Sequence, residues 1–168
     1  MPEYEILKAP DIDKHDTPDF MREFHNHARR TGSVATSDLI ELSDHLILCR
    51  MNPTQYTPPS FIWVGRQAQS RAIFGNSWAD NVHKSQATPI KNYSQPSALG
   101  YLSALVQGFN YDIVRFQDAE MSGVLRRLIM PMKAKPHSSY GFFATMIHYE
   151  EFDLVSGPRS NSDRQNLN

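Results

Sequence analysis

The order of the extended apolar runs constrains the fold of this chain more than any other feature. Two such runs, at 46–51 and 61–68, precede one helical pattern at 97–109. Three further extended runs follow, at 112–117, 124–132 and 140–149. Strands joined by short turns tend to pair antiparallel, and a helix between them must bury its apolar stripe on one face of the sheet. The order therefore predicts an α+β domain with a five-stranded antiparallel sheet.

Two of these segments also predict which residues face the core. In the helical pattern, a single stripe is expected to be buried, made of Leu99, Leu102, Leu105, Val106 and Phe109. The last extended run alternates between two sets of side chains, and both sets are largely apolar. A strand that is apolar on both faces belongs at the centre of a sheet. Its second face is then expected to be covered by an N-terminal helix or by a partner.

An amphipathic helix is predicted within residues 17–32, after a flexible lead-in at 1–16. Thr17 can cap the helix, Pro18 suits its first position, and Gly32 can end it. The apolar face carries the candidate dimer contacts Phe20, Met21 and Phe24. This face must be covered either by the domain's own sheet or by a second copy, and we expect a homodimer. His25 and His27 lie two positions apart and point to different sides, so no shared metal ion is expected.

Composition excludes several classes of protein. Seventeen Lys and Arg against eighteen Asp and Glu give a net charge of −1, which argues against a nucleic-acid binder. The single cysteine, Cys49, excludes an intrachain disulfide and any CxxC site. No apolar stretch approaches the roughly 20 residues of a membrane span, and no signal peptide is apparent. We expect a cytoplasmic protein, with a disordered polar tail at 156–168.

Short motifs in this order resemble those of the PAS fold, in particular the stand-alone PAS-like proteins of alphaproteobacteria. Asp38 to Arg50 is similar to the family's entry into its first strand. Phe61 to Gly65 with Phe74-Gly75 resembles its Val-Gly and Phe-Gly pair. The remaining matches are to its Leu-Pro-Leu strand and its last strand, at Arg126 to Met132 and at Gly141 to His148.

This resemblance implies a PAS-like domain at residues 33–155 with helices packed on one face of the sheet. It also implies a sensory or protein-interaction module that often dimerises. Neither haem nor flavin is supported. The stretch 97–111 lacks the histidine of haem sensors, and Cys49 is in the first strand rather than in the helices that follow the second. No catalytic or DNA-binding segment accompanies the domain, so output is expected through contact with a signalling partner.

A pocket between sheet and helices is the first functional interpretation. Its candidate lining residues are drawn from both the sheet and the helices: Cys49, Trp63, Phe74, Trp78, Tyr101, Leu105, Arg126, Leu128, Met130, Phe143, Thr145 and His148. Each is also a plausible core residue. Arg126 and His148 are polar on an otherwise apolar face, so each needs a partner, a ligand or an edge position. An edge position is the commonest explanation for Arg126.

The alternative interpretation is a small α+β enzyme of the isomerase or hydrolase type. It would use His148 with Glu150 or Tyr101 as acid and base. An enzyme predicts two titratable groups converging in one cavity, whereas a sensor or adaptor predicts an apolar or filled cavity.

Overall fold

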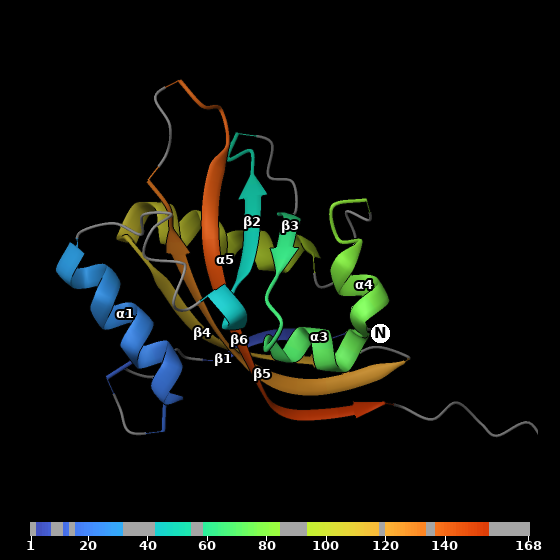
Figure 1. The fold of residues 1–168 in the computed structure, drawn as a ribbon. Helices are drawn as coiled ribbons and strands as arrows, with labels where there is room; N and C mark the ends of the chain where they lie inside the picture. Colours follow the sequence, from blue (N-terminus) through green and yellow to red (C-terminus); the bar gives the residue numbers. More distant parts are fainter. Residues whose placement is uncertain are drawn as a thin grey trace, which may run out of the picture.

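Six strands form one antiparallel sheet in the order β1-β4-β5-β6-β2-β3 (Figure 1). The computed structural model describes residues 3–7, 12–13, 16–31, 43–54, 59–84, 94–117, 120–133 and 137–154. The strands are β1 Glu3–Leu7, β2 Ile47–Met51, β3 Ser60–Val64, β4 Asn110–Gln117, β5 Met121–Pro131 and β6 Gly141–Leu154. The five expected strands correspond to β2 through β6, so the α+β class and the antiparallel sheet are confirmed. The expected tail at 156–168 lies outside the described residues.

The sixth strand was not expected. Residues 3–7 lie in the stretch interpreted as a flexible lead-in, yet they pair with β4 from Glu3↔Gln117 to Leu7↔Ile113. This strand extends the sheet beyond β4. Its partner β4 lies more than a hundred residues later in the chain, so the pairing of so short a strand cannot be deduced from its own sequence.

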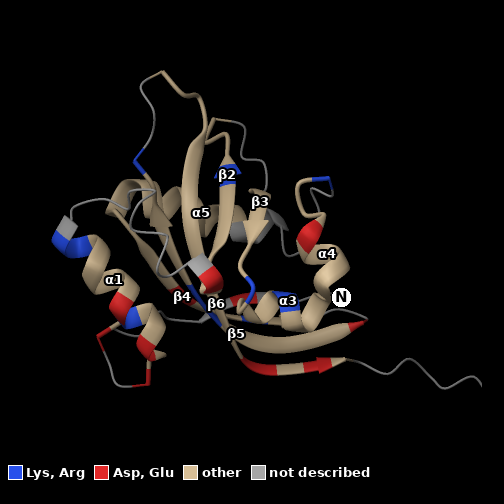
Figure 2. Ribbon diagram, in the orientation of Figure 1, with Lys and Arg blue, Asp and Glu red and all other residues tan. Residues whose placement is uncertain are grey.

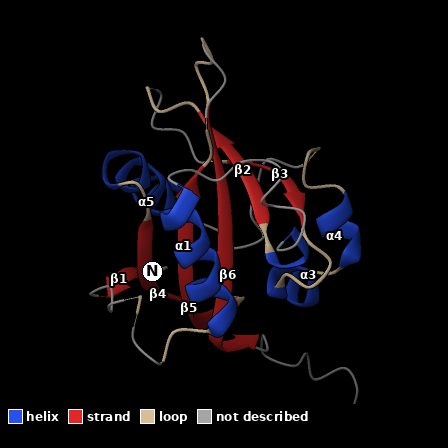
Figure 3. Cartoon of the chain, turned by 60° about the vertical axis from the view of Figure 1, so that its left-hand side comes forward, coloured by secondary structure: helices blue, strands red, loops and turns tan. Residues whose placement is uncertain are grey.

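Helices cover both faces of the sheet. One face carries α3 Gln69–Phe74, α4 Asn76–Asp80 and α5 Ser94–Gln107, and we call it the inner face. The opposite, outer face carries α1 Asp19–Thr31, which lies in front of β5 in Figure 3. A short 3₁₀ helix, η2 Ser43–His45, leads into β2. Only the first group corresponds to the expectation of helices on one face.

The central strand β6 explains why both faces need a cover. Phe143 and Thr145 point to the inner face, Ala144 and Met146 to the outer face, and all four are fully buried. The two-faced pattern of this strand thus places it between β5 and β2, as expected. It also requires α1 as a second layer, because an exposed apolar sheet face of this size is unfavourable in water.

Helix α1 covers the outer face with a stripe at helical spacing. Met21, Phe24, His25 and Ala28 recur at i, i+3, i+4 and i+7, and all are buried. Pro18 contributes the first carbonyl, which accepts hydrogen bonds from the backbone N–H groups of Met21 and Arg22 at 3.0 and 3.2 Å. This helix therefore packs on the sheet of its own chain.

The expected dimer contacts are corrected by this packing. Met21 and Phe24 have no exposed surface, and Phe20 stacks on His45 with ring centroids 5.1 Å apart. Of the two covers considered for this face, the domain's own sheet is the one found. Side chains with no accessible surface in one chain have nothing to offer a second copy.

Helix α5 buries a different face from the one expected. The buried positions are Ala98, Tyr101 and Ala104, whereas Leu99, Leu105 and Val106 are exposed, Val106 to 86%. Small residues allow the helix axis to approach the sheet closely. At Gly100 the approach is tightest, because a Cβ there would lie 2.5 Å from Nη2 of Arg127. Close packing with one inserted tyrosine therefore prevails over the larger apolar stripe.

The short helices α3 and α4 are joined at Gly75 and fixed by one arginine. Gly75 has φ +90°, a conformation that favours glycine, and it connects the two helices without a longer turn. Arg71 donates to the carbonyl of Val64 at 2.9 Å and pairs with Asp80 at 2.8 Å. These contacts hold both helices against the end of β3.

Candidate functional site

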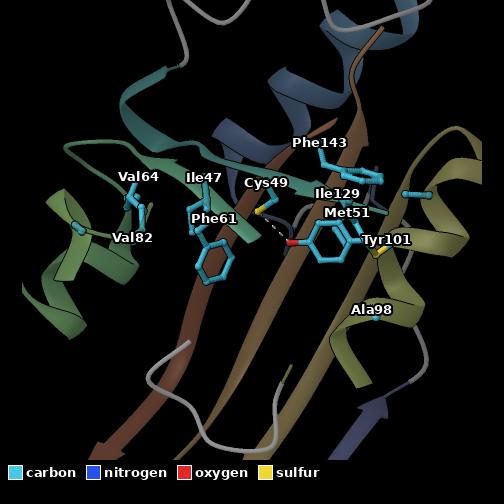
Figure 4. Close-up of a cluster of buried hydrophobic side chains, with 13 residues drawn as sticks. Ile47, Cys49, Met51, Phe61, Val64, Val82, Ala98, Tyr101, Ile129 and Phe143 are labelled. Atoms are coloured by element: carbon cyan, nitrogen blue, oxygen red, sulfur yellow. Dashed lines mark hydrogen bonds between the residues drawn. The ribbon is translucent and has the colours of Figure 1, made fainter. Parts of the chain in front are cut away.

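The inner face brings together four of the expected pocket residues. Tyr101 from α5 lies against Cys49 and Phe143 of the sheet (Figure 4), and it also contacts Thr145. The Thr145 hydroxyl donates to the Tyr101 oxygen at 3.2 Å, and the Cys49 sulfur lies 3.5 Å from the same oxygen. Burial raises the pKa of the Cys49 thiol to about 12 and raises the pKa of Tyr101 well above its usual value. Both groups stay protonated and serve packing, so neither is poised as a nucleophile or base.

A buried ion pair stands beside this cluster. Arg127 is 1% exposed and makes two hydrogen bonds to Asp112, at 3.0 Å from Nε and 2.6 Å from Nη2. Its guanidinium carbon lies 5.7 Å from the centre of the Tyr101 ring. The two-pronged geometry satisfies both carboxylate oxygens. The polar side chains of this cluster and of the ion pair therefore form hydrogen bonds with one another. The four expected pocket residues fill the interior by packing against each other.

The sheet separates the remaining pocket candidates. Arg126, Leu128, Met130 and His148 lie on the outer face, because they alternate with inner-face residues along β5 and β6. Trp63 of β3 pairs with Leu48 of β2, and Trp63 is 37% exposed. Phe74 and Trp78 pack on each other, with ring centroids 5.1 Å apart, and Trp78 also packs against the inner-face cluster that contains Tyr101. The twelve candidates therefore lie on both faces of the sheet, and only some of them can line one pocket.

The burial of Arg126 is explained by its ion-pair and hydrogen-bond partners and not by an edge position in the sheet. It lies on β5, between two other strands, and is 7% exposed. It pairs with Glu150 of β6, and it donates to Tyr111 at 3.1 Å and to Asp16 at 3.2 Å. The C-terminal half of β6 is rich in acidic residues (Figure 2). Because Thr17 also meets the Tyr111 hydroxyl, at 3.1 Å, this network ties the start of α1 to the sheet.

The sheet separates one of the two expected acid–base pairs, His148 with Tyr101. His148 lies on the outer face against Phe20, with ring centroids 6.2 Å apart, whereas Tyr101 lies on the inner face. Glu150 is engaged by Arg126. Burial lowers the pKa of His148, so the ring is neutral near pH 7. His148 and Tyr101 cannot act on one substrate, because the sheet stands between them.

A cavity of about 700 Å³ opens where α1, the C-terminal end of α5 and the end of β5 meet. Two expected pocket residues, Leu105 and Met130, line it. The other lining residues are Ile12, Asp13, His25, Ala28, Arg29, Gln107, Gly108, Phe109, Pro131, Met132 and Lys133. Its volume falls within the range of small-molecule sites, roughly 300–1,000 Å³. The cavity lies on the α1 side of the sheet, outside the inner-face interior where a pocket was expected.

His25 is the unusual group of this cavity. It is 2% exposed, its ring centroid lies 4.5 Å from that of Phe109, and neither ring nitrogen has a hydrogen-bond partner. Burial, followed by the charge of Arg29, lowers its pKa, so the imidazole is neutral at pH 7. A buried polar group without partners costs about 1–3 kcal/mol. A group retained at that cost invites a functional explanation.

Sequence analysis missed this residue, although a signal was present. Its spacing from His27 bears only on a shared metal ion, which is not expected. The spacing of Met21, Phe24 and Ala28 already places position 25 on the buried stripe of α1. A histidine on such a stripe requires a partner, and this requirement marks it more clearly than its distance from another histidine.

Within the described ranges, no three His, Cys, Asp or Glu side chains gather as a metal site would require. No helix in the described part of the chain has the length and apolar character needed to cross a membrane. Comparison with protein-family models, curated proteins and solved structures finds no match.

Proposed function

We propose that this protein is a stand-alone PAS-like sensory or signalling adaptor module, which binds a small ligand and passes the signal on by contact. An antiparallel sheet with α3, α4 and α5 across one face supports the PAS-like part of the proposal. The motifs at Phe61 to Gly65, Phe74-Gly75 and Arg126 to Met132 support it as well.

The observation that carries the proposal is the cavity against α1, with its buried and unpartnered histidine. A ligand there touches three elements at once: α1, α5 and the end of β5. Helix α1 covers the outer face of the sheet and is held at its N-terminal end by the network of Arg126, Tyr111 and Thr17. A ligand at its C-terminal half therefore stabilises one position of α1, and a signalling partner that contacts this helix reads the change.

Native mass spectrometry of the purified full chain, recorded as the assembly and after denaturation, tests the proposal. We expect a small molecule that stays on the folded protein and leaves on denaturation. Ala28→Leu should reduce its occupancy, because the larger side chain projects into the cavity. Ala72→Leu, at an exposed position of α3, is the matched control.

The same spectra report the oligomeric state. We still predict a homodimer, whose surface does not include Met21 or Phe24 because both are buried. A bare protein whose spectra are unchanged in every variant, and which takes up no added small molecule, would refute the sensory proposal.

A further inference from the structure

The cavity under α1 has a strongly apolar wall. Phe109, Met130 and Met132 line it together with Ile12 and Leu105. Methionine side chains adapt their shape to irregular apolar surfaces. An occupant of this wall therefore presents a flexible or flat hydrocarbon body, and the volume of about 700 Å³ accommodates a small molecule and not a folded segment.

Three charged residues line the cavity. They are Arg29, Lys133 and Asp13. Arg29 lies 4.0 Å from Asp13, so these two charges offset each other in part. Lys133 is exposed and has no ion-pair partner among the described residues. The balance is one excess positive charge, which favours a ligand with one negative charge.

His25 lies one helical turn before Arg29 and borders the same cavity. A neutral imidazole offers one N–H donor and one acceptor nitrogen, and both are unpartnered here. A half-turn of the ring about χ2 exchanges nitrogen and carbon positions, so the ring edge that borders the cavity can present a nitrogen to an occupant. The donor is matched by a carboxylate oxygen, and the nearby arginine strengthens that match.

Resting on the proposed sensory function, we infer that the ligand is a small amphipathic monocarboxylate. Its apolar body packs on Phe109, Met130 and Met132. Its carboxylate accepts a hydrogen bond from His25 and faces the positive charges of Arg29 and Lys133. Neither the inner-face cluster around Tyr101 nor His148 takes part.

Calorimetric titration of the full chain with three probes of equal chain length tests this inference. The probes are octanoate, octan-1-ol and octylammonium, which differ only in the head group. We expect octanoate to bind most tightly and to shift the NMR signals of the His25 imidazole. His25→Phe and Lys133→Met should each weaken octanoate binding about tenfold, the size expected for one charge-assisted contact. Lys84→Met, an exposed lysine outside the cavity lining, should leave binding unchanged.

The outcomes separate the two proposals. If octanol or octylammonium binds as tightly as octanoate, the carboxylate assignment is overturned while a ligand site under α1 stands. If octanoate binds but neither His25→Phe nor Lys133→Met weakens it, the site lies elsewhere and the inference fails. If no probe binds and native mass spectrometry finds no ligand, the proposed function fails as well. The folded state of each variant is checked by its unfolding transition, and His25→Phe keeps a ring of similar size in the packed position.

Discussion

The two faces of the sheet differ in how completely their buried polar groups are hydrogen-bonded. On the inner face, Arg127 and Asp112 satisfy each other, and the Tyr101 hydroxyl contacts Thr145 and Cys49. On the outer face, Arg126 has partners, but His25 has two unpartnered ring nitrogens, and the Nδ1 atom of His148 is also unpartnered. Trp78 is an exception on the inner face, because its buried Nε1 lacks a hydrogen-bond partner. Buried polar groups that are all hydrogen-bonded to one another fix the structure, whereas unpartnered groups can still bind a ligand.

The largest expected effect breaks the inner-face pair. Asp112→Ala removes the carboxylate that accepts two hydrogen bonds from a guanidinium that is 1% exposed, and so breaks a buried ion pair. We expect a loss of about 3–5 kcal/mol in the free energy of unfolding, measured by urea titration. Arg115→Ala is the control, because its pair with Glu5 at 3.3 Å is exposed and contributes about 0–1 kcal/mol. Similar losses in both variants would contradict the contrast between buried and exposed pairs.

A smaller effect is expected at the tight contact between α5 and the sheet. In an exposed helix interior, Gly→Ala stabilises by about 1 kcal/mol. At Gly100 the added methyl would meet Arg127, whose guanidinium is held by Asp112 and has little freedom to move. We therefore expect Gly100→Ala to destabilise the protein by about 1–3 kcal/mol in the same titration. Gln107→Ala, at an exposed position of the same helix, should change stability by less than about 0.5 kcal/mol. A stabilised Gly100→Ala variant would show that the helix can move away from the sheet.

The smallest effect, with the opposite sign, is expected on the outer face. His25→Phe replaces an unpartnered imidazole by an apolar ring and should stabilise the ligand-free protein by about 1 kcal/mol at pH 7.

The pH dependence follows from the lowered pKa of His25. Below its ordinary pKa of 6.5 the unfolded chain binds a proton that the folded chain does not. The free energy of unfolding therefore keeps its full value above that pH and decreases as the pH drops towards the folded-state pKa of His25. The charges that face this ring, Arg29 and Asp13, act in opposite directions. The unfolding free energy of His25→Phe, measured from pH 7.5 to pH 5, should fall less steeply than that of the parent protein; an unchanged slope would exclude His25 as the titrating group.

Local patterns in the sequence were sufficient for much of the fold. The alternation in β6 predicts a central strand with two buried faces. The buried face predicted for helix α5 is wrong. The periodicity points to the most hydrophobic residues, whereas the face that packs on the sheet consists mainly of small ones. The physical reason is the close approach at Gly100, which depends on Arg127 and cannot be read from the helix alone.

The candidate site was harder to predict because it depends on which elements meet. Alternation separates Arg126 from Arg127, but it does not say which set faces α5 and which faces α1. Arg126 resembled an edge residue because its partner Asp16 lies 110 residues earlier in the chain. The cavity is similar in this respect, since it joins α1, α5 and β5, and only their packing brings His25 and Met130 together.

The partners of the N-terminal segments have a consequence for synthesis of the chain. Strand β1 pairs with β4, and Thr17 meets Tyr111, so both contacts span about a hundred residues. Contacts this distant close slowly, because a long loop must be ordered before they form. During synthesis, β1 and α1 emerge before β4, β5 and β6 and find no surface to dock on until those strands have followed. These segments thus reach their places only after later strands have been made, and the apolar stripe of α1 stays exposed until then.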